Sequence, residues 1–195
     1  MKVRNLSLIA IAFSVCSLSG IANAGTINFT GAVQDVSCDV NPGTGATGTA
    51  NNITIDLGSV GKDGVANSSN TVSGMATTFA DLEVSCADAG TLSKVKMKFD
   101  AHSGSGAESN RGLLDIANKG GSGVASGVGI AILDSKNTLI DLRDSTKYIE
   151  APLSVSGTSA TAKLSFKAAY MATGAKSAIT AGSANGQLPF VLNYE

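Results

Sequence analysis

Residues 25–37 read GTINFTGAVQDVS, and their alternation of apolar and polar side chains predicts a β-strand. Successive side chains of a strand point to opposite sides, so every second residue shares a face. The members of the apolar face are Ile27, Phe29, Gly31 and Val33. A second alternating segment, residues 186–195, ends the sequence, and its apolar face holds Leu188, Phe190, Leu192 and Tyr194. We expect both segments to be strands that pair with another chain.

The first 24 residues have the pattern of a secretory signal peptide. Lys2 and Arg4 precede an apolar run, residues 6–18, and the small residues Ala22 and Ala24 follow it. This run is shorter than the ~18 apolar residues that a membrane span needs, and no later stretch reaches that length. The mature chain is therefore expected to begin at Gly25 and to be exported without membrane insertion.

Composition limits the classes of partner and of site. Removal of the first 24 residues leaves 171 residues with a formal charge of −3, enough chain for one core of ordinary size. This balance does not favour nucleic acid or an anionic membrane surface. In an exported protein the two remaining cysteines, Cys38 and Cys86, predict a disulfide that stabilises by roughly 4 kcal/mol. Two buried free thiols are the alternative, and with one distant histidine the pair cannot complete a tetrahedral metal site.

The apolar period along the rest of the chain is two, as in half-buried antiparallel strands. Alternating segments occupy residues 53–57, 82–86, 95–99 and 161–170. Connectors rich in Gly, Ser, Asn and Thr separate them, and no stretch has a convincing helical stripe. About eight short strands between turn signals predict an all-β chain, a β-sandwich of immunoglobulin-like kind without a second domain.

No arrangement of catalytic residues stands out in the sequence. His102, the only histidine, lies in a loop-like segment, and we expect it to be a solvated surface residue. Gly43–Gly48 matches Gly-x-Gly-x-x-Gly, but without the following helix that a dinucleotide site requires, so a flexible loop is expected. Lys94, Lys96 and Lys98 are expected to form the solvent face of a strand. We therefore expect no enzyme, no cofactor and no metal.

Four segments together carry a resemblance to a known family. They are residues 25–31 continuing to Ser37 and Cys38, residues 127–134, residues 168–174 and residues 190–195. In this order, and with two cysteines, they resemble the pilin subunits of chaperone–usher fimbriae of the type 1 kind from Gram-negative bacteria. That family commonly has a glycine and a penultimate tyrosine where this chain has Gly182 and Tyr194. The resemblance covers the whole expected mature chain.

The resemblance implies an incomplete immunoglobulin-like β-sandwich, residues 38–195, completed by a donor strand from a neighbouring subunit. Residues 25–37 would be that N-terminal donor-strand extension, with Gly31 over a shallow part of the groove. Its pocket-filling side chains would be Ile27, Phe29 and Val33. The receiving groove would be formed by Gly182, Leu188, Phe190, Leu192 and Tyr194. A periplasmic chaperone would fill this groove first, and its basic residues would hold the carboxylate of Glu195.

The function implied by the resemblance is that of a structural fimbrial subunit, polymerising into a surface fibre that supports adhesion. Its partners would be other copies of itself, other pilins of the fimbria, the periplasmic chaperone and an outer-membrane usher. Export through the inner membrane to the periplasm would precede assembly on the cell surface. Length and composition favour the major shaft subunit. The alternatives are a minor adaptor or terminator pilin, or a closed sandwich that acts as a monomeric periplasmic binding protein.

Overall fold

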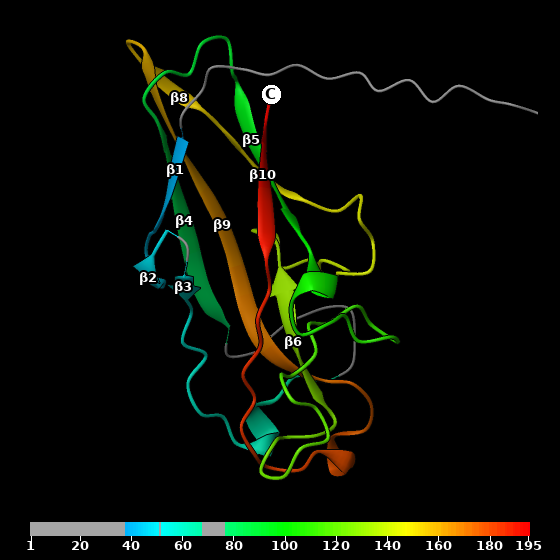
Figure 1. The fold of residues 1–195 in the computed structure, drawn as a ribbon. Coiled ribbons are helices and arrows are strands. Elements are labelled where there is room, and N and C mark those ends of the chain that lie inside the picture. The colour runs from blue at the N-terminus through cyan, green and yellow to red at the C-terminus, as the bar shows by residue number, and fades with distance from the viewer. Residues whose placement is uncertain (1–37, 51, 68–76) are drawn as a thin grey trace, which may run out of the picture. The chain divides into compact units, whose positions relative to one another are not determined.

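The computed structural model describes residues 38–50, 52–67 and 77–195, which form an all-β unit (Figure 1). The predicted signal peptide and the 25–37 extension lie outside the described residues. Within the described ranges the strands are β1 Cys38–Pro42, β2 Thr47–Thr49, β3 Asn52–Thr54, β4 Thr78–Cys86, β5 Lys94–Phe99, β6 Val128–Leu133, β7 Ile149–Pro152, β8 Ser154–Ser156, β9 Ser159–Ala172 and β10 Phe190–Tyr194. Three short 3-10 helices accompany them: η1 Lys62–Gly64, η2 Ala101–Ser103 and η3 Lys176–Ala178.

Two antiparallel sheets enclose the core. The first has the order β1-β4-β9-β6, with β8 also paired to β9, and the second has the order β10-β5-β7. Figure 1 shows β10 beside β5, separate from the long β4 and β9 strands. Phe99 of β5 and Phe166 of β9 meet edge to face across the core, with ring centroids 6.1 Å apart. Aromatic pairs of this geometry add to the apolar burial that joins the two sheets.

Alternation in the sequence identifies the strands that have one face in the core. In β9 the residues Ala162, Leu164, Phe166 and Ala168 are buried. The alternating segments at 82–86, 95–99 and 161–170 are confirmed as parts of β4, β5 and β9. The other two alternating segments are only partly paired, because β3 ends at Thr54 and β10 begins at Phe190.

Strand β6 is not revealed by alternation because both of its faces are buried. Ile130 and Ile132 face the core between the sheets. Ala131 and Leu133 belong to a second apolar cluster on the other side of the first sheet, completed by Ala66, Leu113 and Met171. A strand covered on both sides has a continuous apolar sequence, which removes the period-two signal.

The Gly43–Gly48 segment is anchored to β4 and is not the free loop that its composition predicts. The N–H of Gly43 donates to the Asp81 carbonyl, and the Asp81 N–H donates to the Thr44 carbonyl. The nitrogen–oxygen distance is 2.9 Å in both hydrogen bonds. Gly45 has a φ of +75°, and a Cβ there would lie 1.9 Å from the Phe79 carbonyl oxygen. Close contact with β4 therefore explains this glycine.

The predicted disulfide between Cys38 and Cys86 is confirmed. These residues lie directly opposite each other in the β1–β4 register, and the bond closes a sequence separation of 48 residues. The disulfide ties β1 to β4, and β4 in turn pairs with β9 in the centre of the first sheet.

Replacing both cysteines by alanine should lower the free energy of unfolding by about 4 kcal/mol, because the unfolded chain regains the freedom of the closed loop. Urea unfolding of the Cys38→Ala/Cys86→Ala variant measures this change. The unaltered chain under reducing conditions is the matched control and should show a similar loss. Equal stability of the oxidised and reduced chains would contradict the prediction.

Candidate functional site

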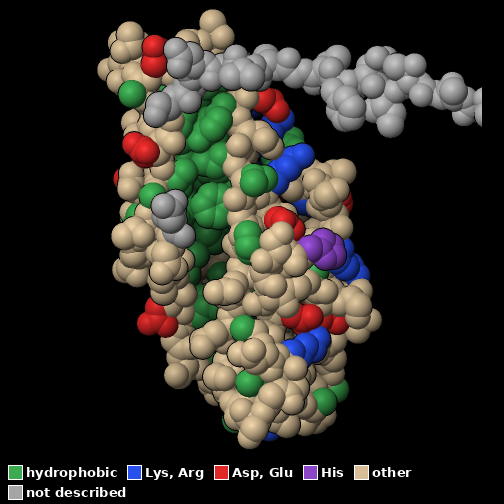
Figure 2. Space-filling model, in the orientation of Figure 1, with side chains coloured by type: hydrophobic (Ala, Val, Ile, Leu, Met, Phe, Trp, Pro, Cys, Tyr) green, Lys and Arg blue, Asp and Glu red, His purple; other side chains and the backbone are tan. Residues whose placement is uncertain are grey.

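An apolar groove separates the 52–57 segment from the segment that leads into β10. Figure 2 shows hydrophobic side chains exposed along this hollow. One wall holds Ile53, Ile55 and Leu57, and the other holds Gly186, Leu188 and Phe190. The main hollow has a volume of about 1100 Å³. Apolar patches of this kind on a surface mark interaction sites.

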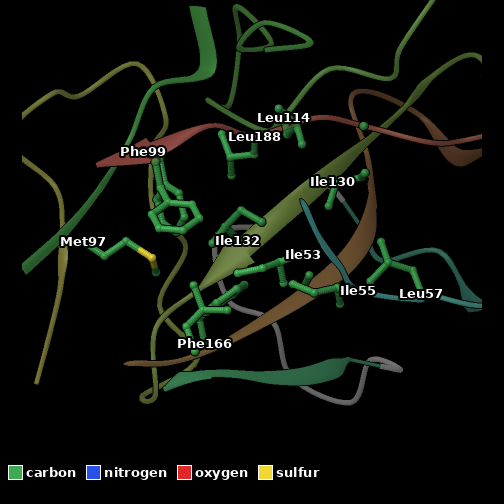
Figure 3. A pocket seen from close by; sticks show the side chains of 14 residues that line it. Ile53, Ile55, Leu57, Met97, Phe99, Leu114, Ile130, Ile132, Phe166 and Leu188 are labelled. Atoms are coloured by element: carbon green, nitrogen blue, oxygen red, sulfur yellow. The ribbon is translucent and has the colours of Figure 1, made fainter. Parts of the chain in front are cut away.

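The floor of the groove opens into a deeper apolar cavity of about 150 Å³. Its floor residues are Leu82, Met97, Phe99, Leu114, Ile130, Ile132, Phe166 and Ala168. Figure 3 shows Ile53 and Leu188, from the two walls, on either side of Ile132 of β6. An apolar cavity of about this size can hold a ring such as benzene. The groove can therefore accept a large apolar side chain from outside.

Strand β10 leaves one backbone edge without a partner among the described residues. Glu195 exchanges two backbone hydrogen bonds with Lys94, both 2.9 Å long. In an antiparallel ladder alternate residues bond to the same neighbour, so the residues bonded toward β5 are Pro189, Val191, Asn193 and Glu195. The residues whose N–H and C=O groups point to the opposite edge are Phe190, Leu192 and Tyr194. Such an edge can pair with an extended strand.

Tyr170 borders the groove and Tyr194 lies farther along β10, and both are neutral phenols at neutral pH. Tyr170 lines the main hollow; burial raises its pKa, and the negative charge of Asp56 raises it further. Tyr194 of β10 is half-buried; burial likewise raises its pKa, and Asp39 of β1 adds to the effect. Both hydroxyl groups therefore stay available as hydrogen-bond donors.

The C-terminal residues named from the sequence occupy different places. Leu188 and Phe190 line the groove, whereas Leu192 and Tyr194 pack against the core farther along β10. Gly182 lies outside the main hollow, in the lining of a neighbouring cavity of about 520 Å³. A Cβ at Gly182 would lie 2.5 Å from the Ala125 nitrogen, so backbone packing accounts for this glycine.

Sequence reasoning missed the wall that faces β10. The alternation of Ile53, Ile55 and Leu57 is visible in the sequence and predicts a half-buried strand. It carries no information about the segment that this strand faces, so no site role follows from it. The donor residues Ile27, Phe29, Gly31 and Val33 lie outside the described residues.

Glu195 is held by the chain itself at the end of β10. Its side-chain carboxylate accepts from the Lys96 ammonium at 2.7 Å and forms an ion pair with Lys94 at 3.2 Å. Its main-chain oxygen accepts from the backbone N–H groups of Ser93 and Lys94 at 2.6 and 2.9 Å. The Lys96 and Lys94 hydrogen bonds lower the pKa of Glu195, and the bond to Glu195 raises the pKa of Lys96. Lys94 and Lys96, predicted to face solvent, thus fix one end of β10.

The expected pH dependence of this contact follows from the lowered pKa of Glu195. The ion pair stabilises the fold above the ordinary glutamate pKa, and its contribution is lost as pH falls through the lower folded-state pKa. Glu195→Gln should therefore reduce the free energy of unfolding at neutral pH and change it little in acid. Denaturant titrations at both pH values measure this, with Asn193→Gln on the same exposed face as the control. An equal loss at both pH values would argue against the ion pair.

Other chemical sites are few in the part of the chain that the structure describes. There, no helix is long and apolar enough to cross a membrane, and no three His, Cys, Asp or Glu side chains are grouped to hold a metal ion. His102 is exposed on η2. What the groove offers is apolar contact together with backbone hydrogen bonds.

Several known fimbrial proteins are similar to this chain in sequence. The chain is 28% identical to a type-1 fimbrial protein subunit of Serratia marcescens and 26% identical to the type-1 fimbrial protein A chain of Escherichia coli K12, each over the full length of both proteins. It is 31% identical to the S-fimbrial protein subunit SfaA of Escherichia coli O6:K15:H31, covering 89% of this chain and 84% of that protein.

Similar chains also occur among the solved structures. The CupB6 tip adhesin from Pseudomonas aeruginosa matches 66% of this chain and 34% of its own, with 24% identity and a TM-score of 0.41. The family model described as fimbrial protein matches residues 27–195. On the strength of that match and of the curated relatives, this chain belongs to the fimbrial protein family.

Proposed function

We propose that this chain, a structural subunit of a fimbria, polymerises by accepting residues 25–37 of a neighbouring copy into its groove. The observation that supports this most is that one edge of β10, beside an apolar hollow, has no partner among the described residues. Added as a strand, the donor segment pairs with the backbone groups of Phe190, Leu192 and Tyr194. Its alternate side chains enter the hollow, as strand addition requires.

The chemistry of the donor segment matches that of the groove. Ile27, Phe29 and Val33 share a face and are apolar, as are the groove walls. Phe29 has the ring that the deep cavity of about 150 Å³ can hold. Gly31 interrupts this face, which suits a point where the acceptor backbone approaches closely. The donor segment is directly followed by Cys38, whose disulfide secures its attachment to the unit.

Strand addition between copies produces a fibre. The donor is the N-terminal segment, whereas the acceptor groove is formed by residues later in the chain. Each contact therefore joins two different surfaces, head to tail, and such contacts extend into a filament instead of closing into a dimer. Each buried large apolar side chain stabilises by about 1.5–3 kcal/mol, and the strand adds backbone hydrogen bonds. Dissociation is then slow, and the fibre persists kinetically at the cell surface.

Before assembly, a subunit with this groove needs a protective partner. A free strand edge beside exposed apolar side chains is an aggregation hazard. A periplasmic chaperone that lends a strand before an outer-membrane usher directs assembly removes that hazard. Its contact at Glu195 has to share or replace the hydrogen bonds from Ser93, Lys94 and Lys96.

Gly31→Asp should abolish polymerisation, because a carboxylate at this position enters the groove without a partner. Gel electrophoresis in detergent, with and without boiling, of material sheared from cells measures the ladder of multimers. Ala32→Asp, on the opposite face of the donor strand, is the matched control and should polymerise. A normal ladder from Gly31→Asp would falsify its inward position.

The same gels bear on whether this chain is the major shaft subunit. If its band dominates the protein of sheared fibres, the major shaft role is favoured.

On the acceptor side, Ile55→Asp should prevent a copy from receiving a donor while leaving its own 25–37 segment able to insert elsewhere. The reason is that Ile55 lines the groove wall. Val191→Asp is the control, since Val191 is 56% exposed and faces away from the groove. Mixing each variant with the unaltered chain and measuring multimer length tests this. Equal shortening by both variants would contradict a groove-specific effect.

A further inference from the structure

Asn185–Gly186 is the only Asn–Gly pair in the sequence, and it lies in the lining of the groove. Both residues border the main hollow and both are exposed to solvent. We propose that this pair is a deamidation site and that its conversion closes the groove to an incoming strand.

The local structure leaves the reacting groups accessible. Deamidation begins when the main-chain nitrogen of Gly186 attacks the side-chain carbonyl carbon of Asn185. Glycine offers the least obstruction to this attack because it has no Cβ. Within the described part of the chain, neither the Gly186 N–H nor the Asn185 side-chain amide has a hydrogen-bond partner. The Asn185 main-chain oxygen accepts from the Ala117 N–H at 2.7 Å, which holds the pair at the wall.

The reaction needs only water. As the bond forms between the Gly186 nitrogen and the Asn185 side-chain carbon, the side-chain nitrogen leaves as ammonia. The product is a cyclic imide. Water adds to either imide carbonyl and opens the ring to aspartate or isoaspartate. The overall change consumes water and releases ammonia, with no oxidation or reduction.

Either product weakens binding of an incoming strand in the groove. A carboxylate replaces a neutral amide in a hollow that already contains Asp56 in its lining, and an incoming strand would desolvate that charge. Isoaspartate also adds a methylene group to the main chain. Beyond it, Gln187 is fixed on both sides of its backbone, because its carbonyl accepts from the Ser105 N–H and its N–H donates to the Ser105 hydroxyl. The added length must therefore displace Gly186 from the wall.

A strand in the groove protects the pair, and this step rests on the proposed function. The added strand excludes water from the wall and restricts the motion that ring closure requires. Subunits with an empty groove therefore lose acceptor capacity with time, whereas subunits within a fibre keep it.

The test uses the purified chain, incubated with and without a synthetic peptide of residues 25–37. Peptide mapping by mass spectrometry measures aspartate and isoaspartate at position 185, and a separate titration measures peptide binding. Asn118, which is followed by Lys119, is the control within the same digest. Asn185→Gln keeps an amide but disfavours ring closure. Gly186→Ala is unsuitable because its Cβ would lie 2.9 Å from Leu114 and 3.0 Å from Ile130.

We expect product at position 185 in the empty chain, loss of product in Asn185→Gln, and little product at Asn118. The aged chain and Asn185→Asp should bind the peptide more weakly than the fresh chain. If Asn185 stays unconverted in the chain incubated without peptide, it is not a deamidation site. If Asn185→Asp binds the peptide as well as the unaltered chain does, conversion does not affect the groove. A peptide that binds without slowing conversion overturns the protection. A peptide that does not bind counts against the proposed function, while the peptide-free sample still decides whether the site reacts.

Discussion

One backbone edge of β10 has no partner in the part of the chain that the structure describes, and the groove is built around this edge. Backbone N–H and C=O groups have to be paired or solvated, and those of Phe190, Leu192 and Tyr194 face away from β5. At Phe190 the same edge borders the apolar part of the groove, so solvation by water leaves large side chains exposed there. An added strand satisfies both needs at once, since it brings hydrogen-bonding groups and apolar side chains in alternation.

The rest of the unit keeps this edge open. The β4–β9 ladder extends over nine residue pairs and supports the floor of the groove. The disulfide ties β1 to β4, and the Gly43–Thr44 turn is hydrogen-bonded to Asp81 of the same strand. Strand β2, which follows this turn, pairs with β3 at the start of the 52–57 wall, and the Thr78 hydroxyl donates to the Asp56 carbonyl of the same wall. The other wall is fixed by the pairing of β10 with β5 and by the Glu195 ion pairs.

Much of the fold could be predicted from the sequence because alternation reports burial on one face. It identified β4, β5, β9 and the core-facing side of β10, and the paired cysteines indicated their bond. It failed for β6, which is buried on both faces, and for the anchored Gly43–Gly48 turn, where the glycines serve close backbone contact. Such contacts depend on strands distant in sequence, which no local pattern encodes.

The candidate site was predictable on one side only. The C-terminal alternation marks Leu188 and Phe190, which do line the groove. The opposite wall at Ile53 and Ile55 depends on how the two sheets pack, and the register of a strand in the groove depends on both walls together. Gly182 lines a second hollow that shares Tyr170, Ala184 and Asn185 with the main one, and its close contact with the Ala125 backbone follows from the fold and not from its place in the sequence.

Directed disulfide cross-linking between two copies tests whether the 25–37 segment of one copy enters the groove of another. One copy has Phe29→Cys, the other has Ile55→Cys, and a third with Val155→Cys on an exposed site is the control. We expect a covalent dimer from Phe29→Cys and Ile55→Cys copies mixed under oxidising conditions, and none with Val155→Cys. Equal cross-linking to both sites, or no cross-link at Ile55 in copies that do form multimers, would contradict insertion of the 25–37 segment into this groove.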